Sequence, residues 1–112
     1  MVPFPAKGIV VILTDGRIAF ASTYFCDLVG IHYSKAAGMS YFDFVFPEDL
    51  DAARQLFQIN KHVKADPFSF RLKRLDAAPL PVWVDIQFAP MKLQSGRVYA
   101  VSAAVTAKTQ VP

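Results

Sequence analysis

The chain has 112 residues, of which 54% are hydrophobic and 19% charged, and its formal net charge at pH 7 is +3. A chain of this length can bury roughly two-thirds of its unfolded surface, enough for one domain with a single core. Its one cysteine excludes an internal disulfide and fits a reducing cytoplasm. No apolar run approaches the roughly 20 residues that span a bilayer, so no membrane insertion is expected.

The first predicted elements are two strands joined by a tight turn. Residues 9–13 form a short apolar run rich in β-branched side chains, which is typical of a strand. Asp15 and Gly16 then form a dipeptide that strongly indicates a two-residue hairpin turn. Residues 18–21 follow as the return strand of this hairpin.

Two short helices are predicted after the hairpin. Ser22 or Thr23 can cap the first helix, which runs through Val29. Gly30 can end it, because glycine adopts the left-handed conformation of a helix C-cap without strain. The second short helix lies around residues 34–37.

A helical corner and a longer helix come next. Ser40 and Asp43 have the spacing of a capping box at the start of a short helix. The longer helix is predicted over residues 47–61, and its first residue is a proline, which suits that position. Glu48 and Asp49 are interpreted as charges that compensate the positive end of its dipole.

Three further strands are predicted at residues 68–74, 82–91 and 98–106. The element order is then two strands, a series of helices and three strands. This order predicts an α+β domain with a five-stranded antiparallel sheet, one face of which is covered by the short helices and the longer helix.

The chain resembles a PAS domain over about residues 8–107, with residues 1–7 and 108–112 as flanking segments. The resemblance rests on the segments Asp15-Gly16-Arg17-Ile18, Leu28-Val29-Gly30, Pro47-Glu48-Asp49, Phe70-Arg71-Leu72-Lys73-Arg74 and Val82-Trp83-Val84. The chain departs from the family pattern at Ser22 (usually Asn), at Phe46 (usually His), at Asp76-Ala77-Ala78-Pro79 (usually a tight Asp-Gly turn) and at Ala104-Val105-Thr106 (usually Asp-Ile-Thr).

The resemblance implies a non-catalytic sensory or regulatory module. Such modules occur in bacterial signalling proteins of the histidine-kinase or cyclic-dinucleotide-enzyme type, where an effector domain lies outside the module. We therefore expect a cytoplasmic domain that passes a change in its sheet to an attached effector.

The resemblance also places a small-molecule pocket between the sheet and the helices. A ligand there would be apolar or neutral, because no inward-facing charge is expected. The alternative is a filled core without a ligand, in which case the module acts only by interaction. The residues predicted to line the pocket are Phe20, Ser22, Phe25, Tyr41, Phe42, Phe57, Phe68, Phe70, Val84 and Ile86.

The opposite face of the sheet is the predicted interface. Alternation along residues 82–88 puts Trp83, Asp85 and Gln87 on the face that the helices do not cover. An aromatic side chain on that face, with Tyr99 on the neighbouring strand, suits a partner surface. We expect a second copy of the chain to bind there as a homodimer.

No cofactor is predicted. Light-sensing relatives bind flavin through a cysteine on the short helix, and this chain has Tyr41-Phe42-Asp43-Phe44 there, which argues against flavin. Haem-binding relatives hold iron through a histidine on or just after the longer helix. His62 is the residue in that position, so a haem sensor remains an alternative.

Nucleic-acid binding and catalysis are not expected. The densest basic cluster, Arg71, Lys73 and Arg74, is interpreted as a solvated strand face. The sequence has no helix-turn-helix pattern, phosphate-binding loop or nucleophile motif. Cys26 is interpreted as an inert, partly buried side chain.

Overall fold

The computed structural model describes residues 8–60, 68–75 and 82–107, apart from the side chains of Asn60, Phe68 and Phe70. In this part of the chain, five strands form one antiparallel sheet in the order β2-β1-β5-β4-β3. The strands are β1 (Gly8–Leu13), β2 (Ile18–Ala21), β3 (Phe68–Leu72), β4 (Val82–Lys92) and β5 (Val98–Ala107). The predicted fold class is therefore confirmed.

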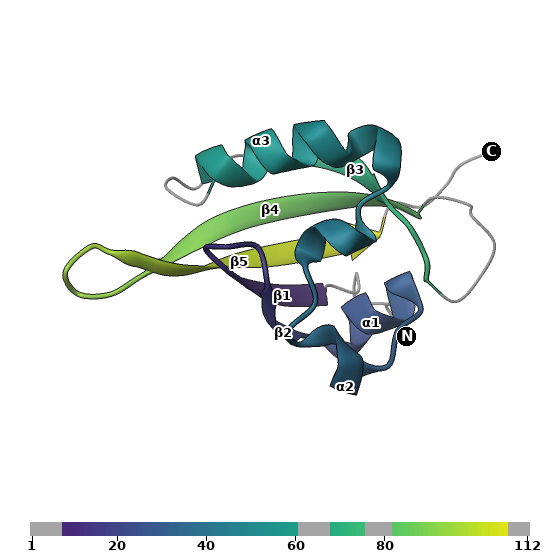
Figure 1. Cartoon of the computed structure of the whole chain (residues 1–112), viewed down its shortest axis with the longest axis horizontal. Coiled ribbons are helices and arrows are strands. Elements are labelled where there is room, and N and C mark those ends of the chain that lie inside the picture. Colours follow the sequence, from purple (N-terminus) through teal and green to yellow (C-terminus); the bar gives the residue numbers. More distant parts are fainter. Residues whose placement is uncertain (1–7, 61–67, 76–81, 108–112) are drawn as a thin grey trace, which may run out of the picture.

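The helices of the described residues lie between β2 and β3 in the sequence. They are α1 (Thr23–Val29), α2 (Tyr33–Ala36), the 3₁₀ turns η1 (Tyr41–Phe44) and η2 (Pro47–Asp49), and α3 (Leu50–Asn60). Figure 1 shows α3 running lengthwise beside β3 and β4, while α1 and α2 lie near β1 and β2. The α-helix predicted from residue 47 begins only at Leu50, because the three residues before it form the 3₁₀ turn.

The predicted β1–β2 hairpin forms, but its turn has three residues, 14–16, between Leu13 and Arg17 rather than two. Leu13 donates its N–H to the carbonyl of Arg17 at 2.8 Å, and Gly16 donates to the carbonyl of Leu13 at 2.8 Å. Gly16 has φ +95° and lies close to the ring of Phe42, so the turn needs a residue without a side chain there. The hairpin turn therefore packs against η1, which carries Phe42.

The helix caps agree only in part with the prediction. Gly30 has φ 70° and ends α1 as a left-handed C-cap. Ser40 caps η1, with its hydroxyl accepting the N–H of Phe42 at 3.2 Å. Ser22 occupies the N-cap position of α1 but makes no side-chain cap; instead its hydroxyl accepts the N–H of Ile9 at 2.9 Å. Ser22 therefore ties the start of α1 to β1.

The core lies between the sheet and the helices. Along β4, Val84, Ile86 and Phe88 are buried, and the residues between them are half-buried or exposed, as the alternation predicts. The other buried core residues are Val10, Ile12, Ile18, Ala21, Phe25, Cys26, Val29, Ala36, Tyr41, Phe44, Val45, Ala53, Phe57, Leu72, Val101, Ala103 and Val105. In the described part of the chain, no helix has the length and apolar character that crossing a bilayer requires.

Candidate functional site

Aromatic rings fill the space between α3 and the sheet. The ring of Tyr41 lies 5.9 Å from that of Phe88 and 6.1 Å from that of Phe57, and Phe57 lies 6.0 Å from Phe88. Two of these contacts are edge-to-face, a favourable arrangement for aromatic pairs. Phe25 and Phe44 form another such pair at 5.6 Å. Three of these rings, Phe25, Tyr41 and Phe57, belong to the predicted pocket residues, whereas Phe44 and Phe88 do not.

Five of the predicted pocket residues are fully buried in this interior: Phe25, Tyr41, Phe57, Val84 and Ile86. Burial raises the pKa of the Tyr41 hydroxyl far above its usual value, so this hydroxyl stays protonated. Phe42 is half-buried, with the guanidinium of Arg54 4.7 Å from its ring centre. The side chains of Phe68 and Phe70 lie outside the described part.

The prediction that Phe20 lines the interior is wrong. Phe20 is 54% exposed and pairs with Val11, which puts it on the uncovered face of the sheet. The ladder has an irregularity between Val11 and Ile12, and Ile18 and Ala21 are the residues of β2 that face inward. Because three positions separate these two inward residues, simple alternation fails in this strand.

The uncovered face of the sheet, called the outer face below, is apolar along β1. Ile9 and Leu13 are exposed on β1, and Phe20 is exposed beside them on β2. Val11 pairs with Ser102 and Ile9 with Ala104, so β5 presents one polar and one small apolar residue beside this apolar surface. Antiparallel sheets with one open face usually alternate apolar and polar residues, so this apolar strip is unusual for a surface in contact with water.

Ile9 and Leu13 were not predicted as surface residues, but both are exposed. Their strand, Gly8–Leu13, is apolar at every position except the first, so alternation cannot say which side chains face the core. This uniform pattern was itself a signal. A strand of a sheet covered on one face needs apolar residues on that face only, and apolar residues on both faces indicate a second contact.

Trp83, Asp85 and Gln87 lie on the outer face as predicted, but Tyr99 does not join them. Tyr99 is exposed at the start of β5, where the register with β4 shifts near Met91. Trp83 lies at the other end of β4, about 27 Å away along the strand at 3.4 Å per residue. Because β4 and β5 run antiparallel, residues near the start of each strand lie at opposite ends of the pair. The expectation that Tyr99 lies beside Trp83 is therefore wrong.

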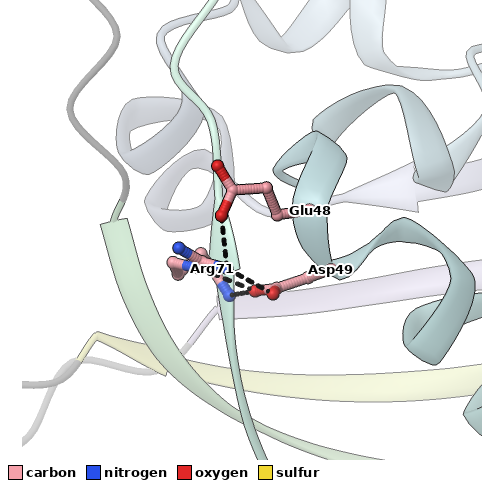
Figure 2. A network of polar contacts seen from close by, with 3 residues as sticks. All are labelled: Glu48, Asp49 and Arg71. Carbon is pink, nitrogen blue, oxygen red and sulfur yellow. Dashed lines mark hydrogen bonds and ion pairs between the residues drawn. The ribbon is translucent and has the colours of Figure 1, made fainter.

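Arg71 and Asp49 form an ion pair that sequence analysis did not predict. Figure 2 shows the guanidinium of Arg71 beside both carboxylates of the η2 turn. Its Nη2 and Nε donate to Asp49 at 2.7 and 3.0 Å, and Glu48 lies 3.5 Å from Nη2. The side-chain hydrogen bonds to Arg71 lower the pKa of Asp49, and the same contacts raise the pKa of Arg71.

Two interpretations are corrected by this pair. Arg71 was interpreted as part of a solvated strand face, but its side chain is only 22% exposed. Asp49 was interpreted as a dipole-compensating charge, but it also joins η2 to β3. The edge of β3 is covered in the same region, since Phe46 donates its N–H to the carbonyl of Arg71 at 2.9 Å.

A hollow of about 310 Å³ lies at the surface where α1 ends, lined by Cys26, Asp27, Gly30, Ile31, His32 and Arg74. Arg74 donates to the carbonyls of Asp27 and Leu28, which are at the C-terminal end of α1. The thiol of Cys26 is buried, and burial and the nearby Asp27 raise its pKa. A thiol in this state is a poor nucleophile.

His62, the candidate haem ligand, lies outside the described residues. Within the described residues, no group of three or more histidine, cysteine, aspartate or glutamate side chains is placed to hold a metal ion.

Comparison with known proteins agrees with the fold. The PAS domain of a protein from Colwellia psychrerythraea has a TM-score of 0.80 at 16% identity, covering 92% of this chain and 86% of that one. The PAS domain of an HTR-like protein from Haloarcula marismortui gives 0.72 at 18%, covering 91% and 81%. The PAS-B domain of Drosophila melanogaster Cycle, solved with ethylene glycol bound, gives 0.77 at 14%, covering 90% and 99%.

Identities this low support the shared fold and nothing finer. Among curated protein sequences, none matches this chain significantly. The family model for the PAS domain, however, matches residues 6–107, which is nearly the whole sequence. The chain therefore belongs to the PAS-domain family.

Proposed function

We propose that the chain is a non-catalytic regulatory PAS module of a cytoplasmic signalling protein, of the histidine-kinase or cyclic-dinucleotide-enzyme type. In this proposal the module works by binding a second copy of itself on the outer face and passing the change to an effector domain. The observation that carries the proposal is the apolar strip of Ile9, Leu13 and Phe20 on that face.

A second copy is the occupant that this strip favours. Exposed apolar side chains gain free energy when another surface removes them from water. The strip lies on the two neighbouring strands β1 and β2 and forms one exposed apolar surface. A surface that meets its own copy about a two-fold axis is complementary to itself. The module would then signal through the relative position of the two sheets.

The test compares two charged substitutions at similarly exposed apolar positions. Phe20→Asp changes the outer face, and Ile59→Asp, at a residue 59% exposed on α3, is the control. We expect the wild-type chain and Ile59→Asp to form dimers in analytical ultracentrifugation. Phe20→Asp should weaken the dimer at least about tenfold, since a desolvated charge costs more than one kcal/mol.

Trp83→Glu locates the contact more closely. If it separates the copies and Phe20→Asp does not, the contact lies on β3 and β4 rather than on the apolar strip. A wild-type chain that stays monomeric up to high micromolar concentration contradicts the proposed dimer altogether.

Ligand sensing in the interior is the second candidate. It is supported by the buried Tyr41 hydroxyl, a polar group set among the rings of Phe57 and Phe88. The ligand would be small and apolar or neutral, matching these walls. Native mass spectrometry of the purified chain tests this, because a bound molecule adds a discrete mass that a filled core does not show.

Haem binding through His62 is the least favoured candidate. Reconstitution with haem should give a Soret band if it binds, and His62→Ala should remove that band. No Soret band in the wild-type chain would rule this candidate out.

A further inference from the structure

Arg71 contacts both sides of the molecule. On the outer face it pairs with Trp83 across β3 and β4, and its guanidinium lies 5.4 Å from the centre of the Trp83 ring. At the edge of the sheet, the same guanidinium donates two hydrogen bonds to Asp49 (Figure 2). It also lies 5.0 Å from the centre of the Phe46 ring. One side chain therefore joins the outer face to the start of α3.

The backbone holds the same junction. Arg71 donates its own N–H to Asp49 at 2.9 Å and accepts the N–H of Phe46 at 2.9 Å. Lys73 donates to the carbonyl of Phe44 at 2.9 Å. These contacts attach residues 44–49 to the edge of β3, and this short segment leads directly into α3.

The segment matters because the aromatic interior depends on it. We call residues 41–60, which comprise η1, η2 and α3, the helical cover. The cover contributes the buried rings of Tyr41, Phe44 and Phe57 to the interior. If the bond between Asp49 and β3 weakens, the helical cover is therefore attached less tightly to the sheet, and its rings are packed less tightly in the interior.

We propose that Arg71 couples the outer face to the helical cover. A partner that lies over Trp83 also removes water from the neighbouring Arg71–Asp49 pair. Opposite charges attract more strongly when less water surrounds them, so the pair tightens and the cover closes more firmly. The partner rests on the proposed function, but the coupling is a property of the single chain and is tested there.

The first test uses the monomer and a built-in reporter. Trp83 is the only tryptophan of the chain, so its fluorescence reports on the guanidinium beside it. Asp49→Asn weakens the hold on Arg71 and should change the Trp83 emission. It should also speed amide hydrogen exchange at residues 44–50 by about threefold or more, the size expected for a partly exposed ion pair.

Asp51→Asn is the matched control, because Asp51 is an exposed acid two positions further along the same helical segment. It should change neither the emission nor the exchange. Arg71→Lys keeps the positive charge but cannot donate the paired hydrogen bonds, so it should behave like Asp49→Asn. If Asp49→Asn and Arg71→Lys leave both readouts at wild-type values, the coupling is contradicted.

A double-substitution cycle provides the second test. Trp83→Leu should speed exchange at residues 44–50, although the substitution is on the outer face. If both residues act through Arg71, the combined Trp83→Leu and Asp49→Asn variant should exchange more slowly than the product of the two single effects. Agreement with that product to within about twofold, as independent sites give, would contradict the coupling.

These outcomes separate the coupling from the proposed function. A chain that stays monomeric but shows the emission change and the non-multiplicative cycle keeps the coupling and contradicts the dimer. A chain that forms dimers through Phe20 but shows neither effect keeps the dimer and contradicts the coupling.

Discussion

Asp49 accepts three hydrogen bonds from Arg71, although the two residues are 22 positions apart in the chain. Two come from the guanidinium and one from the backbone N–H. All three favour the charged form of the carboxyl, so they lower the pKa of Asp49. The pair thus makes the attachment of α3 to β3 dependent on pH.

The first prediction concerns acid stability. The pKa of Asp49 is lowered from 3.8 in the folded chain, so the unfolded chain binds more protons near and below that pH. The stabilisation is fully present above the unfolded pKa and is lost as pH falls through the lower folded pKa. Asp49→Asn should therefore flatten the loss of unfolding free energy below about pH 4. Urea unfolding at a series of pH values measures this.

Asp51→Asn serves as the control for the acid-stability prediction. It removes an acid from the same region while leaving the contacts of Arg71 in place, so comparison of the two variants separates the loss of the ion pair from the loss of one carboxyl. An unchanged slope in Asp49→Asn would show that the pair does not contribute to stability.

The second prediction concerns the aromatic interior. Phe57 is fully buried, and its ring contacts those of Tyr41 and Phe88. Phe57→Ala removes these contacts and leaves a cavity, so it should lower the unfolding free energy by about 3–5 kcal/mol. Ile59→Ala, two residues along the same helix but exposed, should change it by less than about 0.5 kcal/mol. Similar losses in both variants would mean that the interior is not packed as described.

The arrangement of β4 could be predicted because its alternation is regular. Val84 and Ile86 are buried while Trp83 and Asp85 are not, so burial along this strand follows the two-residue period. A long central strand with polar residues on one face leaves little choice of orientation.

The position of Phe20 could not be predicted in the same way. Its strand has only four residues, and the irregular ladder beside Val11 puts Ile18 and Ala21 inward together. The inward preference of a large aromatic side chain was then the remaining guide, and the local register overrode it.

The Arg71–Asp49 pair lay beyond sequence reasoning for a different reason. Each residue has an ordinary local explanation, one as a solvated strand cation and the other as a helix N-terminal acid. Their contact requires the segment between η1 and α3 to lie along the edge of β3, which depends on the assembled fold.

The third prediction concerns Ser22, whose hydroxyl accepts the N–H of Ile9 rather than capping α1. Ser22→Ala should lower the unfolding free energy by about 1 kcal/mol, the net value of one such hydrogen bond. Hydrogen exchange at Ile9 should also become faster, whereas a cap would protect the first turn of α1. Exchange that rises only in residues 24–26 would favour the capping role.

The fourth prediction compares two turn glycines. Gly16 and Gly96 have nearly equal positive φ angles, +95° and +89°. Replacement of either by alanine should cost about 1–2 kcal/mol for the left-handed backbone. A Cβ at Gly16 would also lie 2.9 Å from Cε2 of Phe42, whereas one at Gly96 would meet no atom within 4 Å. Urea unfolding of the two variants isolates the cost of this contact.

The ring of Phe42 has little freedom to move away from such a side chain. It packs edge-to-face on Phe57 at 5.7 Å, and Arg54 lies over it. Gly16→Ala should therefore cost about 1 kcal/mol or more beyond Gly96→Ala, the penalty expected for overpacking. If Phe42→Ala is added, the excess should disappear, because the obstructing ring is gone. Equal costs for the two glycine substitutions would mean that the hairpin turn does not pack against the ring of Phe42.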